Sequence, residues 1–281
     1  DGERRWTMGR YERKLTAVAR IVVAAGRGSP PEIVGLAEIE EARVLEDLVV
    51  HPILRPYDYA YLHREGPDHR GMEVACLVRG KLMDELDWRH FTDPRWTLAD
   101  STRAMLSLGC RTSGGRDLEL VLLHFLSRYR GAGASAPLRR EQMRSLCALM
   151  DSLHRCHPAS LVVAAGDFNA EPGDWSIGIS PADSTRNPGA YPGDCPDLRV
   201  FPDPLSCRGS YRYRGHWSLI DFFLALKANG DIQIGGWVLE LPPLLCEDAS
   251  YGGEKPFRTY EGYSYRGGPS DHLPVVLDIS W

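Results

Sequence analysis

The sequence predicts an α/β fold in which helices cover a β-sheet, and three observations support it. Short apolar runs of strand length alternate along the chain with segments whose apolar residues recur at helical spacing. The 281 residues are 43% hydrophobic and 25% charged, which is ordinary for a globular protein near the upper size of a single core. No internal repeat, low-complexity tract or linker divides the chain. We therefore expect residues 1–281 to form a single domain.

The first expected elements are a helix, a strand and a second helix. Apolar side chains recur at helical spacing over residues 11–26. Residues 33–36 form a short buried strand that leads to Glu38, and residues 41–50 return to helical spacing.

The rest of the chain continues this alternation. A third helix carries its apolar face on Leu146, Leu149, Met150 and Leu153. Residues 171–210 and 242–270 are rich in proline, glycine, aspartate and serine, and we expect long loops there, which are often functional. Further strands are expected over residues 118–123, 161–165, 220–226 and 275–279.

Charge and hydropathy exclude several classes of protein. Thirty-three Lys and Arg against 38 Asp and Glu give a net charge of −5, so long duplex DNA is not the expected ligand without a local basic patch. The longest apolar stretches are far shorter than the roughly 18 residues needed to cross a bilayer. The seven cysteines include no C-x-x-C pair, which disfavours a structural zinc site and leaves the disulfide state open.

Polar residues able to do chemistry lie within or beside the apolar runs. A buried strand accommodates a charged group where that group has a partner, a metal or a task. In Asp167-Phe168-Asn169 an extended backbone points the carboxylate and the amide to one side and turns Phe168 into the core. The residues concerned are Glu38, His124, Asp167, Asn169, Asp221, Asp271 and His272.

Each of these residues also has a purely structural explanation. Glu38 could favour the N-terminus of the following helix, and Asp167 or Asn169 could form a turn. The two histidines could be hydrogen-bonded structural residues, and Asp271 could precede a strand. Asp221, inside a strand-like run, is the hardest to explain in this way. Their joint occurrence favours one common site.

Four sequence blocks, in this order, resemble the endonuclease/exonuclease/phosphatase superfamily, which includes deoxyribonuclease I, abasic-site endonucleases, neutral sphingomyelinases and inositol polyphosphate 5-phosphatases. The resemblance runs from about Gly9 to the C-terminus, and residues 210–221 and 251–274 look like a bacterial branch of that superfamily. The blocks are Gly35-Leu36-Ala37-Glu38-Ile39-Glu40, Gly166-Asp167-Phe168-Asn169, Ile220-Asp221 and Ser270-Asp271-His272-Leu273-Pro274.

The resemblance implies a four-layer α/β sandwich, in which two mixed sheets pack face to face between helices. It also implies a divalent metal, Mg²⁺ or Mn²⁺, with Glu38 as the principal ligand and Asp271 close to it. Carboxylates suit these hard cations, and the chain lacks the Cys/His cluster that would favour zinc.

The same resemblance implies roles for the other site residues. His272 would be the general base, held by Asp221, and Asp167 would position the attacking water. Asn169 would hold a phosphate oxygen, and His124 would contact the scissile phosphate. In-line attack on a phosphate ester calls for these types of residue, because it needs a base and polar or cationic groups around the charged oxygens.

Two features depart from the family pattern. The family usually begins with a strand whose Asn contributes to the metal and phosphate site, whereas residues 1–10 contain no Asn. We therefore expect the natural protein to carry a further N-terminal strand, and we favour an exported protein over a cytoplasmic one. In addition, Leu123 precedes His124 where the family often has Asn.

Substrate contacts are expected from basic and aromatic residues near these blocks. Arg128 could guide a phosphate, although a basic run beside a helix is often a solvated face. Tyr213 and Trp217 lie where aromatic and basic residues alternate, which suits base stacking but is also typical of a half-exposed strand. Arg258 is expected to bind an anionic substrate, and the other explanation is that its loop packs onto the sandwich.

Together these observations predict a divalent-metal-dependent hydrolase of phosphate esters, a phosphodiesterase or nuclease with a His-Asp activated water. The alternatives are a phospholipid or inositol-phosphate hydrolase of the same fold, or a non-catalytic binding module. We expect a monomer whose partner is a phosphate-ester substrate, with nucleic acid among the candidates.

Overall fold

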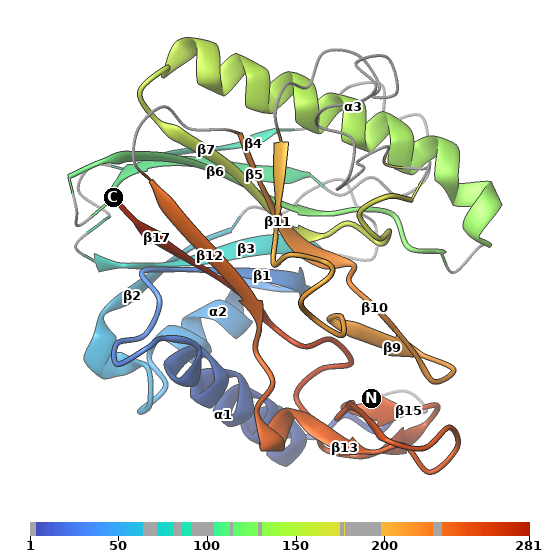
Figure 1. The fold of residues 1–281 in the computed structure, drawn as a ribbon. Coiled ribbons are helices and arrows are strands. Elements are labelled where there is room, and N and C mark those ends of the chain that lie inside the picture. The colour runs from blue at the N-terminus through green and yellow to red at the C-terminus, as the bar shows by residue number, and fades with distance from the viewer. Residues whose placement is uncertain are drawn as a thin grey trace.

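The fold was analysed in a computed structural model, which describes residues 4–63, 72–80, 82, 86–91, 104–112, 115–128, 131–174, 177, 198–226 and 232–281. The chain folds into four layers (Figure 1). Helix α3 (Ala132–Cys156) covers a six-stranded sheet, and a second layer of strands packs against the other face of that sheet. Helices α1 (Met8–Ala25) and α2 (Ala42–Val49) cover the outer side of this second layer.

The six-stranded sheet is mixed, with the order β4-β5-β6-β7-β11-β8. Strands β6 and β7 run parallel and are connected through α3, whereas the other neighbouring pairs are antiparallel. The strands are β4 (Asp87–Phe91), β5 (Met105–Arg111), β6 (Asp117–His124), β7 (Leu161–Asp167), β8 (Leu198–Phe201) and β11 (Asp221–Leu226).

The second layer contains a three-stranded sheet of order β1-β3-β2 and a separate antiparallel pair, β12 with β17. Figure 1 shows both between the large sheet and helices α1 and α2. The strands are β1 (Ile33–Ile39), β2 (Tyr59–Leu62), β3 (Glu73–Arg79), β12 (Gln233–Val238) and β17 (Val275–Ser280).

Three hydrophobic clusters hold the layers together. The first joins α3 to the six-stranded sheet, for example through Met150 and Phe222. The second lies between the sheets, where Cys76 of β3 and Leu122 of β6 belong to one buried cluster. The third joins α1 and α2 to β3 and includes Leu45. Each strand layer is therefore buried on both faces, which confirms the predicted four-layer α/β sandwich.

Short elements lie at the edge at which β1 and β7 end and β11 begins (Figure 1). The helical turns η1 (Arg55–Tyr57) and η5 (Pro242–Leu244) lie elsewhere along the chain. The short strands form three hairpins: β9 (Tyr211–Tyr213) with β10 (His216–Ser218), β13 (Leu245–Glu247) with β14 (Glu254–Pro256), and β15 (Tyr260–Glu261) with β16 (Ser264–Tyr265).

The expected helices and strands are all present, but the two expected long loops need correction. Strand β8 lies within residues 171–210, and four short strands lie within residues 242–270. Strands of two to four residues in Pro- and Gly-rich sequence are too short for a period of two to be recognised. Strands β2, β3, β4, β5 and β12 were also not among the expected elements.

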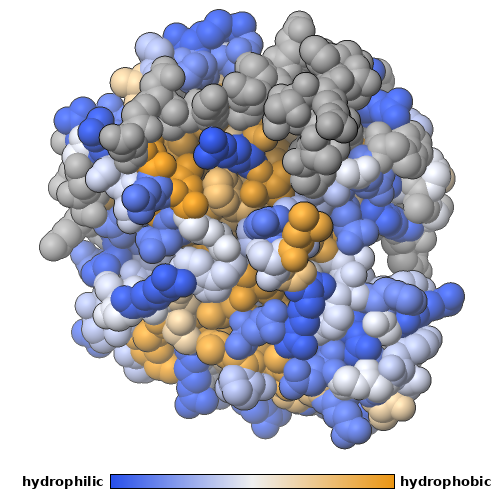
Figure 2. All heavy atoms as spheres, viewed as in Figure 1, coloured by the Kyte–Doolittle hydropathy of each residue, from blue (hydrophilic) through white to orange (hydrophobic). Residues whose placement is uncertain are grey.

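The surface of the face drawn in Figure 2 is mostly hydrophilic, and hydrophobic residues reach it in separate areas. In the described part of the chain no helix is long and apolar enough to cross a membrane. The six cysteines in that part are free thiols, and Cys195 lies outside the described residues.

Candidate active site

Strand register brings three of the predicted site residues into one row. Parallel pairing of β6 and β7 places His124 beside Asp167, and antiparallel pairing of β7 and β11 places Asp167 beside Asp221. The row lies at the edge of the six-stranded sheet where β6 and β7 end and β11 begins. His124 Nε2 lies 3.4 Å from Asp167 Oδ2, and both side chains are buried.

Gly166 allows β6 and β7 to approach each other closely beside this row. Its φ of 146° lies in the region that favours glycine, and an added Cβ would lie 1.9 Å from the carbonyl oxygen of Leu123. The glycine of the G-D-F-N block is therefore required by the backbone contact next to Asp167.

Asp167 and Asn169 meet as predicted, but the backbone between them is not extended. Strand β7 ends at Asp167, and Asn169 has a φ of 50°. The Asn169 amide N–H donates to Asp167 Oδ1 at 2.7 Å, and its side-chain Nδ2 donates to Asp167 Oδ2 at 2.9 Å. Asn169 can adopt the left-handed conformation because its short polar side chain bonds to its own turn. Phe168 points into the core, where its ring stacks on Phe222.

His272 and Asp221 form a close pair beside the same row. His272 Nδ1 lies 2.7 Å from Asp221 Oδ2, and this oxygen also accepts a 2.6 Å hydrogen bond from Ser210 Oγ. Ser210 Oγ in turn accepts the backbone N–H of Asp221 at 3.0 Å. The Asp221 carboxylate is thus fixed from two sides and can orient the imidazole.

The charge on His272 is strongly stabilised by its neighbours. Burial favours the neutral ring, but the charge and hydrogen bond of Asp221, followed by the charges of Asp167 and Asp271, raise the pKa of His272 to about 10. Ligand atoms of Asp167, Asp221 and His272 all lie within 4.8 Å of one another. We interpret this group as an ion-paired cluster, because the Nδ1 of His272 is already engaged by Asp221.

Glu38 and Asp271 are the carboxylates best suited to hold a cation. Glu38 lies at a β-bulge of β1 with a φ of 62°, and bulges of this kind redirect side chains. Both side chains are exposed, and within the described residues neither forms a hydrogen bond or ion pair. Both act on one half-buried cation, since their charges oppose the burial that lowers the pKa of Lys14. Two carboxylates with free oxygens around one positive charge fit a divalent metal site.

Lys14 and Ser210 beside the site were not expected from the sequence, whereas Tyr211 belongs to the alternating aromatic and basic residues considered for substrate contact. Lys14 lies next to the two exposed carboxylates, and Ser210 holds Asp221. The ring of Tyr211 packs on that of His272 with centroids 4.8 Å apart, and burial raises its pKa. No apolar run marks Lys14 or Ser210, and the sequence signal for Ser210 and Tyr211 is that both lie in the family-like segment of residues 210–221.

Both arginines that were predicted to bind substrate, Arg128 and Arg258, lie next to residues of the site. Arg128 donates from Nε to the carbonyl oxygen of Asn169 at 2.8 Å and pairs with Asp174 at 2.8 Å. Arg258 donates to the carbonyl oxygen of Arg212 at 3.0 Å, and its guanidinium lies 5.6 Å from the ring centre of Tyr211. Arg128 therefore borders Asn169, and Arg258 borders the aromatic wall of His272.

Tyr213 and Trp217 lie on opposite faces of the β9–β10 hairpin. Tyr213 is on the same face as Tyr211 and is 57% exposed, with Arg214 near its ring. Trp217 pairs in register with Arg212 on the other face, and Arg208 stacks over it at 4.8 Å. Trp217 borders a hollow of about 540 Å³ between the hairpin and residues 171–174.

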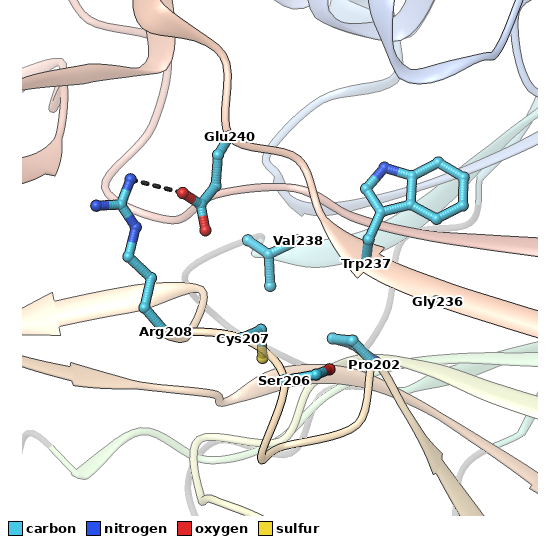
Figure 3. A pocket seen from close by; sticks show the side chains of 8 residues that line it. All are labelled: Pro202, Ser206, Cys207, Arg208, Gly236, Trp237, Val238 and Glu240. Carbon is cyan, nitrogen blue, oxygen red and sulfur yellow. Dashed lines mark ion pairs between the residues drawn. The ribbon is translucent and has the colours of Figure 1, made fainter.

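A second hollow, of about 420 Å³, lies on the other side of Cys207 and Arg208 (Figure 3). It is bordered by β12 and by the segment around Pro202, and none of the predicted site residues lines it. Arg208 is held there by Glu240 at 2.6 Å and by Glu254 at 3.3 Å. The charges of this hollow are paired with each other, so we place the active site at the His272 cluster.

Comparison with known families and structures gives a consistent result. The model of the Endonuclease/Exonuclease/phosphatase family matches residues 1–280. No curated protein sequence matches the chain.

Several solved structures share the fold at low sequence identity. TDP2 of D. rerio in complex with single-strand DNA product is 13% identical, with 96% of this chain and 92% of that chain covered and a TM-score of 0.60. A mannosyl-6-phosphatase of Bacteroides thetaiotaomicron is 17% identical, with coverage of 97% and 93% and a TM-score of 0.59. The human Nocturnin catalytic domain with bound sulfate is 16% identical, with coverage of 96% and 86% and a TM-score of 0.57.

Proposed function

Because the chain belongs to the endonuclease/exonuclease/phosphatase family, we propose that it is a divalent-metal-dependent phosphodiesterase. The observation that supports this most is the 2.7 Å contact between His272 and Asp221, formed within 4.8 Å of Asp167. An imidazole held by a carboxylate and placed beside a second carboxylate is suited to bind and deprotonate a water molecule. This arrangement favours an enzyme over a binding module.

In the proposed reaction, the Nδ1–H of His272 donates a hydrogen bond to Asp221, which stays ionised, and the free Nε2 acts as the base. The water oxygen forms a bond to phosphorus while its proton moves to Nε2. The bond between phosphorus and the leaving oxygen then breaks, and that oxygen takes up a proton from a solvent water molecule, while the proton on Nε2 is later released to solvent. Asp167, opposite Asp221 in the sheet, orients the water.

Glu38 and Asp271 are proposed to hold the cation, with Mg²⁺ preferred because both ligands are hard oxygens. The bound cation supplies positive charge for the phosphate oxygens and offsets the carboxylates that raise the pKa of His272. Mn²⁺ has similar ligand preferences and is expected to replace it.

His124 is proposed to contact the phosphate. Asn169 is proposed to contact it as well, but it must first give up one of the hydrogen bonds that it makes within the protein. Both N–H donors of the Asn169 side chain are used, one by the carbonyl oxygen of Phe125 at 3.0 Å and one by Asp167 at 2.9 Å. Asn169 can donate to a phosphate oxygen if it releases one of these bonds. We propose that it holds Asp167 before substrate binds and exchanges this contact for the phosphate.

The substrate class is proposed as a phosphodiester, with single-stranded nucleic acid among the candidates. Among the similar structures, TDP2 of D. rerio is complexed with a single-strand DNA product, and another is a mannosyl-6-phosphatase. A net charge of −5 gives no general attraction for long duplexes.

A substrate panel tests the proposal. Oligonucleotides, bis(p-nitrophenyl) phosphate, sugar phosphates, inositol phosphates and phospholipid vesicles would be assayed with Mg²⁺, with Mn²⁺ and with chelator. We expect cleavage of diesters that chelator abolishes and that His272→Ala lowers strongly, while His154→Ala on α3 leaves it unchanged. Hydrolysis of phosphomonoesters alone would contradict the diesterase assignment, and equal activity with chelator would contradict metal dependence.

A further inference from the structure

Lys14 is a half-buried cation whose two hydrogen bonds reach a distant part of the chain. Its ammonium group donates to Thr259 Oγ1 at 2.9 Å and to the carbonyl oxygen of Pro269. These partners lie 245 and 255 residues further along the chain. Removing an ammonium group from water costs free energy unless charges and hydrogen bonds compensate for it. The contacts of Lys14 therefore matter to its place in the fold.

Residues 257–269 form an arm whose two ends meet at its base. The two partners of Lys14, Thr259 and Pro269, lie on opposite sides of this base. Thr259 Oγ1 donates to the carbonyl oxygen of Gly268 at 2.8 Å, and the Gly268 N–H donates to the carbonyl oxygen of Arg258 at 3.1 Å. An added Cβ at Gly268 would lie 1.8 Å from the carbonyl oxygen of Phe257, so the two sides of the arm are in tight contact. Lys14 therefore fastens both sides of this base to α1.

The arm leads directly into the proposed metal site. Asp271 follows Pro269 by two residues, and the His272 N–H donates to Ser270 Oγ at 3.1 Å. Glu38 comes from β1, on a different element, and Lys14 lies close enough to Glu38 and Asp271 for both charges to act on it. The contacts of Lys14 thus connect the position of the Asp271 backbone to the helix that packs beside β1.

We propose that Lys14 is a positioning residue of the metal site, which sets the place of the Asp271 carboxylate relative to Glu38 by fastening the base of the arm to α1. This inference rests on the proposed function, because it takes Glu38 and Asp271 as the ligands of the cation. Groups that orient metal ligands from behind commonly matter for metal affinity nearly as much as the ligands.

The sign of the effect on metal affinity separates positioning from charge. An ammonium group near the site repels a divalent cation, so its charge alone would make metal binding tighter when Lys14 is removed. Loss of a positioning contact has the opposite effect, because Asp271 is then no longer held at the required place. A lysine that serves only to stabilise the fold would change the melting temperature and leave the affinity unchanged.

Titration with Mn²⁺ alone, followed by electron paramagnetic resonance, measures this affinity without turnover. We expect Lys14→Met to raise the dissociation constant about tenfold or more, and Lys14→Arg to restore part of the loss. Thr259→Val removes one acceptor, leaves the charge in place and should weaken binding in the same direction. The matched control is Lys255→Met, since Lys255 is 19% exposed and bonded at 2.6 Å to Glu261 in the β15–β16 hairpin of the arm, away from the base that Lys14 fastens. Equal or tighter Mn²⁺ binding by Lys14→Met overturns the inference.

A second measurement on the metal-free protein keeps the inference separate from the proposed function. Amide hydrogen exchange at Gly268 and His272 should speed up about tenfold or more in Lys14→Met, with no change in β17. Unchanged exchange at these two amides overturns the positioning role. If the unaltered protein binds no Mn²⁺, the metal assignment in the proposed function fails, and the exchange result still decides whether Lys14 holds the arm.

Discussion

Asp167 and Asp221 are directly opposite each other in the β7–β11 pair, an arrangement in which two like charges destabilise a sheet. His272 reaches both from outside the sheet, and its pKa is raised by them. The imidazolium therefore offsets the charge repulsion that the strand register creates. Structure and chemistry depend here on the same three side chains.

This dependence predicts that Asp221 and His272 act as one unit in catalysis. His272→Ala should lower kcat/KM on the order of 10³-fold or more, because it removes the base. Asp221→Asn should have an effect of similar order, and the double variant should be little worse than His272→Ala alone. A mutant cycle measured on one diester checks this, with Ser210→Ala as a milder variant that keeps both members. Losses that simply add in the double variant would show that the two residues act independently.

The raised pKa of His272 predicts a pH-dependent stability of the metal-free protein. The group has a pKa of about 10 in the fold against 6.5 as its ordinary value, so its contribution is fully present below pH 6.5 and is lost as pH rises through 10. Nitrogen NMR in chelator should find the ring protonated at pH 8, and Asp221→Asn should bring the pKa down toward 6.5. The free energy of unfolding, measured in urea, should fall from pH 7 to 10 more steeply in the unaltered protein than in His272→Ala. Equal slopes would contradict the shift.

The sequence indicated the acids, amide and histidines of the site because each adjoins an apolar run. It did not indicate Lys14, which stands beside Leu15 in an amphipathic helix and there resembles a solvated lysine. The burial of Lys14 depends on an arm that is 245 residues away in sequence. The roles of the site residues stay predictions, and the experiments above decide them.

At the scale of elements, what could be predicted depended on the length of each strand. Strands β7 and β11 are mostly buried apolar runs, and the sequence located both. The three hairpins at the site edge have strands of two or three residues and are held by side-chain contacts such as the Arg212–Asp248 ion pair at 3.1 Å. Contacts of that kind join distant residues, so local periodicity does not reveal them.

The contact between β6 and β7 predicts that Gly166 tolerates no side chain. Gly166→Ala would place a Cβ 1.9 Å from the Leu123 carbonyl oxygen at a φ of 146°, and we expect a loss of about 3 kcal/mol or more in the free energy of unfolding. Gly133→Ala in α3 is the matched control, because nothing lies within 4 Å of its Cβ. That control should gain about 0.5 to 1 kcal/mol from helix propensity. Urea unfolding of both variants checks this, and a Gly166→Ala protein as stable as the control would contradict the close approach.

At the scale of the whole molecule, the site gathers residues from both strand layers at one edge. Glu38 belongs to β1 of the three-stranded sheet, Asp167 and Asp221 belong to the six-stranded sheet, and Asp271 precedes β17. The fold positions these residues through its layers, because no short segment contains more than one of the four sequence blocks at residues 35–40, 166–169, 220–221 and 270–274. A cation bound by Glu38 and Asp271 would therefore connect β1 to the segment that enters β17.

This connection predicts that a divalent metal stabilises the entire fold. A ligand that binds only the folded state adds about 2.7 kcal/mol at 100 times its dissociation constant, which corresponds to roughly 5 °C or more in Tm for a chain of this size. Thermal unfolding with Mg²⁺ or Mn²⁺ should show this rise over chelator, while NaCl at equal ionic strength should not. Glu38→Gln keeps the shape of the side chain, removes its charge, and should abolish most of the rise while the Tm in chelator changes little, because Glu38 is exposed. A rise as large in Glu38→Gln as in the unaltered protein would place the cation elsewhere, and the Asp167, Asp221 and His272 group would then be the next site to examine.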